Sequence, residues 1–452
     1  MEHYMDAINY AERWIKIIKA QEVDAETAKT ISRETVDNFV NHFNKGWVQY
    51  RKSVTEAGDY AGTEWRGNGI YFYDVFGNEY IDCLGGYGAL DLGWSHPEVV
   101  DAVRAQVCRS GIPSQELMDP LRGVLAKLLS HITPGDIDHA FFVGSGTETI
   151  EGALKVAKLY TGKHNFISTV RGFHGKTLGS LSVMGKKDFR APLQPYGGQT
   201  FYIPFGDADA LEKQLEICDR VGIDIAGFIA EPIQGEAGAI VPPDDFWPRV
   251  RELCVHYGIL LIADEVQTGM GRTGRLWGLD HWNVIPDILC LAKSLGGGVM
   301  PIGAFMGSGK IWEVFEEPNP FIHSTTTGGN PLSCAAAIAA IQVTLRDKLP
   351  QRAAENGAYF INQLKLLSEE YPQIYDRITG KGLLIGQHFK DVKIGYKVAA
   401  GLFKRKVLVA GTFINAHTIR IEPPLIITKE EIDEVLNRLR DTLKEVAQGL
   451  LT

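Results

Sequence analysis

Short apolar runs alternate with helical patterns between about residues 85 and 335. The clearest runs, which predict buried strands, are residues 140–143, 225–230, 259–263 and 288–292. Residues 147–160, after the first run, have the apolar spacing of a helix. Strands that alternate with helices predict an α/β domain with a mostly parallel sheet and helices on both of its faces.

The N-terminal part of the chain has a different pattern. Residues 1 to about 50 are predicted to be helical and amphipathic, because apolar residues such as Trp14 and Ile18 stand among many charged ones. Residues 70–82 contain two β-rich runs separated by a glycine–asparagine pair, which predicts a hairpin. We therefore expect an N-terminal helical segment and hairpin over residues 1–84.

The C-terminal part, residues 336–452, has the pattern of a smaller α+β domain. An alanine-rich helix comes first, short strands such as residues 406–410 follow, and a long helix ends the chain. This last helix begins with Thr428 and Glu431 in the spacing of a capping box and carries apolar residues along one face. The predicted large domain between the two ends spans residues 85–335.

Composition and charge exclude several classes of protein. The 452 residues are 45% hydrophobic and 22% charged, which is ordinary for a folded globular protein and excludes disordered or collagen-like chains. The formal net charge of -9, without a basic tail, argues against a nucleic-acid partner. No apolar stretch reaches the roughly 18 residues of a membrane span, so no membrane association is expected.

The cysteines and the N-terminus indicate the compartment. The six cysteines have no C-x-x-C spacing, so we expect reduced thiols and neither a disulfide framework nor a metal site. The first residues lack the basic and apolar regions of a signal peptide. A cytoplasmic location is the prediction that follows.

Residues 269–274 match the dinucleotide fingerprint G-x-G-x-x-G by letter. That fingerprint requires its first glycine directly after a strand and a helix behind its last glycine. Here residues 264–268 come between the strand and the first glycine, and no helical pattern follows. A P-loop is also incomplete, because its leading glycine would fall at Val170. A plain glycine-rich loop fits better than a nicotinamide site.

Residues 144–149 form a turn of small residues between a predicted strand and a predicted helix. The first N–H groups of a helix lack intrahelical partners and bind anions, and Ser145 and Thr147 add hydroxyl donors. The turn is therefore a candidate phosphate site, although an ordinary helix cap could have the same sequence.

Asp264 and Lys293 each follow a buried apolar run. Ligands bind at the carboxyl ends of strands in open α/β sheets, where a carboxylate can pair with a cationic nitrogen and a desolvated lysine becomes nucleophilic. Alone, Asp264 would be interpreted as a helix cap or ion-pair partner and Lys293 as a surface residue. Together with a phosphate site they indicate pyridoxal 5′-phosphate (PLP), which needs a Schiff-base lysine, an acid at its ring nitrogen and a phosphate anchor.

Further motifs carry a family resemblance. The motifs are residues 144–148, 231–236, 263–269, 292–298, 328–331 and 420–425, in order between about Gly69 and Leu443. They resemble the signatures of the class III aminotransferases, which are PLP-dependent enzymes of fold type I. The extra N-terminal helical segment is similar to that of the diamine (putrescine) aminotransferases within this family. The same subgroup is indicated by residues 50–55, 114–117 and 407–412.

The resemblance implies roles for the residues of the cofactor site. Lys293 would bind the cofactor and move the substrate proton, and Asp264 would keep the ring nitrogen protonated. The other implied contacts are Ser145, Gly146 and Thr147 at the phosphate, Phe173 and Val266 against the two ring faces, His174 beside Phe173, and Gln267 at the ring hydroxyl.

The resemblance also implies an oligomer. Thr326 matches a threonine that reaches the phosphate of the neighbouring subunit, which implies a homodimer with shared active sites, or a tetramer containing it. The family usually has an aromatic residue next, where this chain has Thr327.

For the substrates, Glu236 and Arg420 resemble a gated pair. Arg420 would bind the carboxylate of a 2-oxo acid, and Glu236 would neutralise Arg420 when a diamine occupies the site; a structural salt bridge is the alternative. Gln115 and Tyr87 are candidates for the substrate entrance. Ornithine aminotransferases have an arginine where this chain has Lys176, which weakens that assignment.

The implied reaction is ping-pong transamination from a terminal primary amine, putrescine or cadaverine, to 2-oxoglutarate or pyruvate. A broader ω-amine:pyruvate aminotransferase is the nearest alternative, and ornithine aminotransferase is a weaker one. Outside the family, a NAD-dependent oxidoreductase and an inactive member of the fold that acts as a binding protein stay open. The intact Lys293 and Asp264 argue against the inactive protein.

Overall fold

The structure is a computed structural model that describes residues 4–20, 22–54, 62–412, 415 and 417–451. The chain divides into two compact units, one of residues 1–67 and 71–81 and the other of residues 68–70 and 82–452. The domain boundaries expected near residues 84 and 335 stay a prediction. Of the 50–55 motif, Thr55 lies outside the described residues.

The first unit combines helices with a hairpin. Its helices are α1 (Met5–Lys19), α2 (Ala25–Asn38), a π-helical segment (Phe39–Asn44) and α3 (Lys45–Val54). Its strands are β1 (Glu64–Asn68), β2 (Tyr71–Asp74) and β3 (Glu79–Asp82), of which β2 and β3 pair antiparallel as the predicted hairpin. Ala28 and Ile31 of α2 and Val75 after β2 form its small apolar core.

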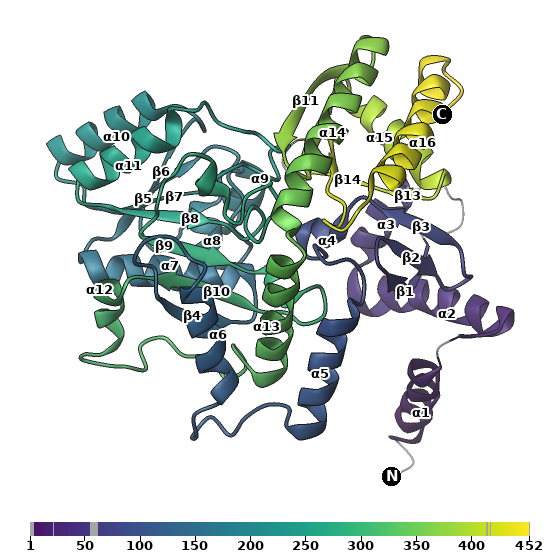
Figure 1. Ribbon diagram of the computed structural model, residues 1–452, viewed down its shortest axis with the longest axis horizontal. Helices are drawn as coiled ribbons and strands as arrows, with labels where there is room; N and C mark the ends of the chain where they lie inside the picture. The colour runs from purple at the N-terminus through teal and green to yellow at the C-terminus, as the bar shows by residue number, and fades with distance from the viewer. Residues whose placement is uncertain (1–3, 21, 55–61, 413–414, 416, 452) are drawn as a thin grey trace. The chain divides into compact units, whose positions relative to one another are not determined.

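The second unit contains a seven-stranded sheet with the order β4-β10-β9-β8-β7-β5-β6. The strands are β4 (His139–Val143), β5 (Asn165–Thr169), β6 (Thr200–Ile203), β7 (Ile225–Ala230), β8 (Leu260–Asp264), β9 (Ile288–Leu291) and β10 (Gly303–Gly307). β10 runs antiparallel to both β4 and β9, whereas the neighbouring strands from β9 to β6 are parallel. The predicted, mostly parallel sheet is confirmed (Figure 1).

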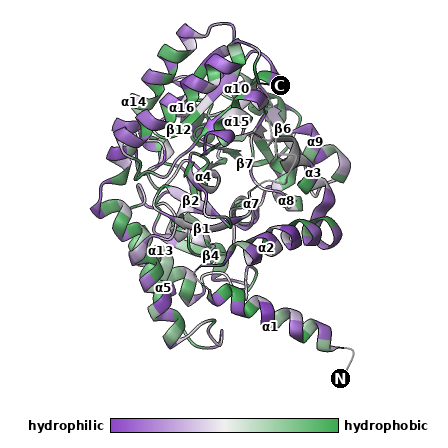
Figure 2. Cartoon of the chain, turned by 90° about the vertical axis from the view of Figure 1, so that its right-hand side faces the viewer, coloured by the Kyte–Doolittle hydropathy of each residue, from purple (hydrophilic) through white to green (hydrophobic). Residues whose placement is uncertain are grey.

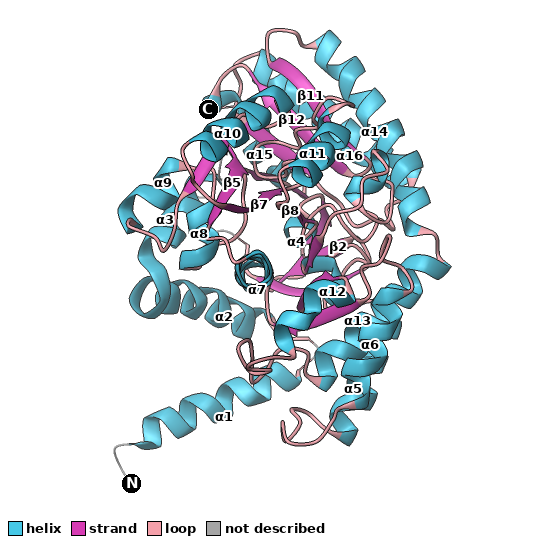
Figure 3. Cartoon of the chain, turned by 90° about the vertical axis from the view of Figure 1, so that its left-hand side faces the viewer, coloured by secondary structure: helices cyan, strands magenta, loops and turns pink. Residues whose placement is uncertain are grey.

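Helices cover both faces of this sheet. In β8, Leu261 and Ala263 belong to one apolar cluster and Leu260 and Ile262 to another, because side chains alternate between the two faces of a strand. The first cluster includes apolar residues of α6 (Pro120–Ser130), α10 (Ala208–Arg220), α11 (Phe246–His256) and α13 (Pro331–Arg346). The second cluster includes apolar residues of α7 (Gly146–Thr161), which packs against several strands (Figure 3).

The C-terminal residues form a four-stranded antiparallel sheet with the order β11-β12-β15-β14. Its strands are β11 (Tyr375–Lys381), β12 (Leu384–Phe389), β14 (Ala410–Gly411) and β15 (Thr418–Ile421). The helices of this part are α14 (Leu349–Glu370), α15 (Val392–Lys404) and α16 (Lys429–Ala447). The run predicted as one strand at 406–410 is instead divided between β13 (Val407–Leu408) and β14.

The helix α16 confirms its predicted start and its apolar face. Thr428 Oγ1 accepts a hydrogen bond from the Glu431 N–H, and Glu431 Oε2 accepts one from the Thr428 N–H. Ile432, Leu436 and other residues of one face are buried, and Figure 2 shows hydrophilic and hydrophobic residues alternating along the helix. Among the described helices, none is long and apolar enough to cross a membrane.

The remaining helices of the second unit include α5 (Pro97–Arg109), which contacts α13, and the short helices α4 (Gly85–Gly88), α8 (Leu178–Val183), α9 (Lys187–Arg190) and α12 (Gly309–Trp312). The glycine-rich segment 269–274 forms turns, and no helix begins behind it. The prediction that it is a loop, and not a dinucleotide site, is confirmed.

Candidate active site

A cavity of about 640 Å³ lies at the carboxyl ends of the strands of the large sheet. Because β10 is antiparallel to both β4 and β9, those two strands run in the same direction as β8, and all three end at one edge. Ligands of open α/β sheets bind at this edge. The sequence-predicted residues that line the cavity are Ser145, Gly146, Thr147, Phe173, His174, Glu236, Asp264, Val266, Gln267 and Lys293.

The candidate phosphate site is the N-terminus of α7. Ser145 is the N-cap, and its Oγ accepts a hydrogen bond from the Glu148 N–H at 3.4 Å. The N–H groups of Gly146 and Thr147 come at the start of the helix, where no carbonyl of the preceding turn can accept from them. A Cβ at Gly146 would come within 3.0 Å of Val266 Cγ1, so only glycine leaves this cradle open. The cradle fits the phosphate of PLP.

The Thr147 hydroxyl is used inside the protein. Its Oγ1 lies 2.8 Å from Thr177 Oγ1 and donates to Ser180 Oγ at 2.9 Å. Gly175 has a φ of +110°, and a Cβ there would come within 2.3 Å of Thr147 Oγ1. The hydroxyl contacts therefore fix the start of α7 to the 175–180 segment, and the backbone N–H of Thr147 is the group that this arrangement offers to a phosphate.

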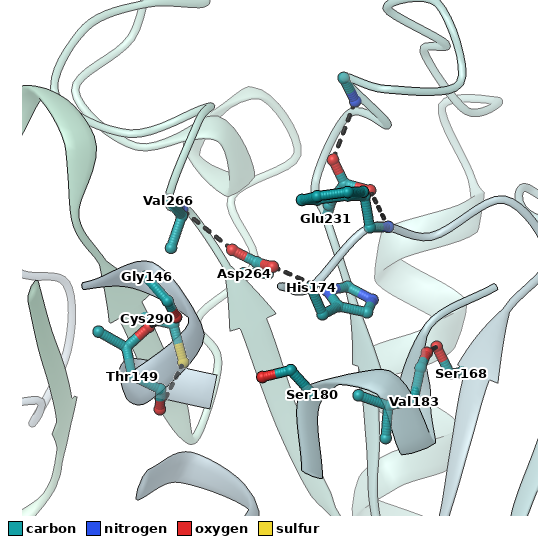
Figure 4. A network of polar contacts seen from close by, with 12 residues as sticks. Gly146, Thr149, Ser168, His174, Ser180, Val183, Glu231, Asp264, Val266 and Cys290 are labelled. Atoms are coloured by element: carbon teal, nitrogen blue, oxygen red, sulfur yellow. Dashed lines mark hydrogen bonds and ion pairs between the residues drawn. The ribbon is translucent and has the colours of Figure 1, made fainter. Parts of the chain in front are cut away.

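Asp264 ends β8 and is held by two hydrogen-bonding groups (Figure 4). Its Oδ2 lies 2.7 Å from His174 Nδ1, and its Oδ1 accepts from the Val266 N–H at 3.1 Å. Both side chains are buried, and His174 Nε2 has no hydrogen-bond partner within the described part of the chain. A buried carboxylate fixed in this way can stabilise a protonated pyridine nitrogen, so the acid also fits PLP.

Glu231, at the end of β7, is a buried carboxylate to which the sequence gave no role. Its Oε1 accepts from the Phe173 N–H at 3.0 Å, and its Oε2 accepts from the Gly235 N–H at 2.9 Å (Figure 4). Burial raises the pKa of Glu231 to about 7. This residue joins the loop that carries Phe173 and His174 to the turn that carries Glu236. The only signal in the sequence was an acidic residue directly after an apolar strand.

Lys293 follows β9 and has a φ of +47°. A lysine in the left-handed region is uncommon and costs conformational energy, which surrounding contacts must offset. Burial lowers the pKa of its ammonium group, and Glu422 is the first of the charges that oppose this shift. A lysine with a lowered pKa has a larger neutral, nucleophilic fraction.

Arg420 on β15 and Glu236 form a buried ion pair. Arg420 Nη2 lies 2.6 Å from Glu236 Oε1, and Arg420 Nη1 donates to Gln267 Oε1 at 3.3 Å. The Arg420 guanidinium carbon also lies 5.3 Å from the centre of the Tyr87 ring. Tyr87 is thus placed beside this pair, and its predicted role at the substrate entrance stays a prediction.

The amide of Gln267 is connected to the same cluster. Its Nε2 donates to the Tyr87 carbonyl at 3.1 Å and to Glu422 Oε1 at 2.7 Å. These contacts place Gln267 between the cavity and Arg420, and its predicted contact to the ring hydroxyl stays a prediction.

Gln115 and Thr326 lie elsewhere. Both are exposed, neither lines the cavity, and Gln115 Nε2 donates to the Thr326 carbonyl at 2.7 Å. Lys176 lies near aromatic rings, with its Nζ 4.7 Å from the centre of the Phe189 ring. The structure therefore brings Gln115 and Thr326 together but separates both from the cavity of the same chain.

Comparisons with known proteins match this geometry. The model of the family "Aminotransferase class-III" matches residues 60–443. The putrescine aminotransferase of Pectobacterium atrosepticum is 46% identical over 447 residues, which cover 98% of this chain and 95% of that protein.

Solved structures agree. A PLP-bound amine transaminase from an uncultivated Pseudomonas species is 31% identical, with a TM-score of 0.79 over 86% of this chain and 95% of that one. The ornithine aminotransferase of Toxoplasma gondii is 31% identical, with a TM-score of 0.80 over 92% of this chain and 99% of that one. A transaminase from the marine bacterium Virgibacillus is 26% identical, with a TM-score of 0.85 over 93% and 100%.

Proposed function

Because the chain belongs to the class III aminotransferases, we propose that it transfers the primary amino group of a short aliphatic diamine, putrescine or cadaverine, to a 2-oxo acid. Its cofactor is PLP, as in the rest of this family. The observation that carries the proposal is the buried Arg420–Glu236 pair beside the cavity that Lys293 and Asp264 line. The high similarity to a putrescine aminotransferase supports the choice of diamine.

The residues of the cavity divide the work of binding the cofactor. The N–H groups of Gly146 and Thr147 hold the phosphate, and Asp264 keeps a proton on the ring nitrogen. Phe173 and Val266, which line the cavity, hold the faces of the ring. When bound, PLP supplies an electron sink that stabilises negative charge at the substrate carbon beside the amine.

Lys293 is the base of the reaction. Its lowered pKa allows Nζ to bind the cofactor and afterwards to remove the proton from the amine-bearing carbon of the substrate. The same Nζ returns this proton on the opposite side of the transfer. No other described lysine lines the cavity, so one amine performs both steps.

Arg420 and Glu236 allow one site to accept two kinds of substrate. While Glu236 is paired with Arg420, a diamine without a carboxylate meets no unpaired cation. The carboxylate of 2-oxoglutarate or pyruvate replaces Glu236 on Arg420, because an arginine binds a carboxylate through two parallel hydrogen bonds. The amine therefore reacts first and the oxo acid second.

The active enzyme is a homodimer, or a tetramer that contains it. Thr326 is exposed and outside the cavity of its own chain, which supports its use at the cofactor phosphate of a second copy. Gln115 supports the Thr326 backbone through the 2.7 Å hydrogen bond. We place the enzyme in the cytoplasm, where the six free cysteines stay reduced.

A panel of amino donors tests the function. Purified enzyme with PLP and 2-oxoglutarate or pyruvate is given putrescine, cadaverine, ornithine or alanine, and the amino acid product and the aldehyde product are measured by mass spectrometry. We expect the diamines to be converted with the highest kcat/KM, and ornithine less well because Lys176 replaces an arginine. Preference for ornithine or for a simple monoamine would overturn the diamine proposal within the family.

A further inference from the structure

Arg420 faces a second buried carboxylate, that of Glu422. The two residues are separated by one position at the end of β15, a spacing that places side chains on the same face of an extended strand. Glu422 Oε2 lies 3.9 Å from Arg420 Nη1, and both side chains are fully buried. The proposed gate assigns no role to Glu422, although its charge lies as close to the arginine as an ion pair.

The hydrogen bonds of Glu422 are incomplete. Its Oε1 accepts from Gln267 Nε2 at 2.7 Å, whereas its Oε2 has no hydrogen-bond partner within the described ranges. Arg420 Nε is also without a partner there. A buried carboxylate oxygen without a hydrogen bond is costly to maintain, so a structural role alone does not account for it.

The backbone around Glu422 is fixed. The Glu422 N–H donates to the Cys83 carbonyl at 2.8 Å, and the next carbonyl, that of Pro423, accepts from Arg272 Nη1 at 2.6 Å. Gly88 has a φ of +86°, and a Cβ there would come within 2.8 Å of Glu422 Oε1. Glu422 therefore cannot swing away as Glu236 must, and its charge stays beside Arg420 throughout the reaction.

We propose that Glu422 is a specificity-determining residue: a fixed negative charge that weakens the binding of carboxylates to Arg420. The inference rests on the proposed function, in which Arg420 receives the oxo-acid carboxylate. When that carboxylate replaces Glu236, it joins an arginine that Glu422 already compensates, and the two anions repel each other. The product amino acid carries the same carboxylate, so Glu422 also promotes its release. The site thereby favours donors that have no carboxylate beside the reacting amine.

The test measures carboxylate binding without turnover. The dissociation constant of glutarate, or of propionate if the enzyme uses pyruvate, is measured by calorimetry on the PLP-loaded protein. In Glu422→Gln the amide oxygen can still accept from Gln267, but the charge is gone. We expect glutarate to bind roughly five- to twentyfold more tightly, as the loss of one repelling charge at this range predicts. The KM for the oxo acid should fall in parallel.

Three variants make the result specific. Glu422→Asp keeps the charge and should keep an affinity close to that of the wild type. Glu422→Ala removes the charge in a second way, in case the glutamine variant does not fold. Glu265→Gln removes another buried carboxylate, whose hydrogen bonds go to Thr268, Gly278 and Leu279, and should leave glutarate binding unchanged.

The outcomes are distinguishable. Unchanged or weaker glutarate binding in both neutral variants, with wild-type conversion of putrescine intact, would overturn the role of Glu422 alone. Failure of the wild type to convert any diamine would overturn the proposed function, whatever the variants bind. Tighter binding in all variants, Glu265→Gln included, would show a general loosening of the site and also contradict the specific role.

Discussion

Asp264 Oδ2 lies 2.7 Å from His174 Nδ1, and both side chains are buried at the edge of the large sheet. The imidazole holds the carboxylate in one orientation, the orientation in which it can face the ring nitrogen of PLP. The pair connects β8 to the loop that carries Phe173, so a change in either residue should affect the cofactor directly.

His174→Ala should weaken cofactor binding. Removing the partner of a buried carboxylate costs about 1–3 kcal/mol, which corresponds to roughly tenfold weaker PLP binding or more. The dissociation constant of PLP, measured by fluorescence titration of the apoenzyme, checks this expectation. His139→Ala is a matched control, because His139 contacts Asp138 on the surface and not Asp264. Equal PLP affinity in wild type and His174→Ala would show that Asp264 needs no support.

Gly175→Ala should disturb the phosphate site. The left-handed φ of +110° strains any other residue, and the added Cβ would overlap Thr147 Oγ1. We expect a loss of about 2 kcal/mol or more in stability together with weaker PLP binding. Gly162→Ala, at the other end of α7, is the control, since its φ is +66° but nothing lies within 4 Å of the new Cβ. If both variants reduced PLP affinity alike, the effect would belong to α7 as a whole.

Arg420→Ala should separate the two half-reactions. The reaction with 2-oxoglutarate should fall by about 100-fold, because the carboxylate loses a charged hydrogen-bonding partner. The half-reaction with putrescine should be affected much less. Single-turnover measurements of each half-reaction in a stopped-flow instrument check this, and equal damage to both would indicate a structural role.

The same variant should be less stable. Without Arg420, the buried carboxylates of Glu236 and Glu422 lose their cation, which costs about 3–5 kcal/mol. The double variant Arg420→Ala/Glu236→Ala should recover part of that loss in urea unfolding. No recovery would argue that the Arg420–Glu236 pair is not coupled in the folded protein.

Glu231 should make stability depend on pH. Burial raises its pKa from 4.5 to about 7, so the folded protein binds this proton more tightly than the unfolded chain does. Between these values the folded state holds more protons, and the free energy of unfolding therefore falls as the pH rises from 4.5 to 7. In Glu231→Gln this contribution disappears, and the wild type should lose about 2–3 kcal/mol relative to the variant across the window.

Urea unfolding of both proteins at several pH values checks the role of Glu231. Glu265, whose pKa burial also raises to about 7, titrates in both proteins and cancels in the comparison. Parallel stability curves would mean that Glu231 does not hold its proton in the folded state.

Much of the fold and of the cofactor site could be predicted from the sequence. The strands that end at Val143 and Asp264 are continuous apolar runs, because both of their faces are covered, and the chemistry-bearing residues follow them directly. Parallel strands place their ends at one edge of the sheet. Residues far apart in sequence, such as Ser145 and Lys293, therefore line one cavity.

Other features depend on tertiary contacts that no local pattern shows. The antiparallel strand β10 is only five residues long and has glycine at both ends, so its pattern resembles a loop. The hydrogen bonds of Gln267 depend on Tyr87 and Glu422, which are distant in sequence. The position of Thr326 relative to a cofactor depends on a second copy of the chain.

The most direct test of the proposed function is the visible absorbance of the PLP-loaded protein before and after putrescine, without any oxo acid. We predict that the cofactor band disappears with putrescine and returns when 2-oxoglutarate or pyruvate is added. Lys293→Ala, which lacks the base, should show no such cycle. A cofactor band that putrescine and cadaverine leave unchanged in the wild type would contradict the assignment of a diamine donor.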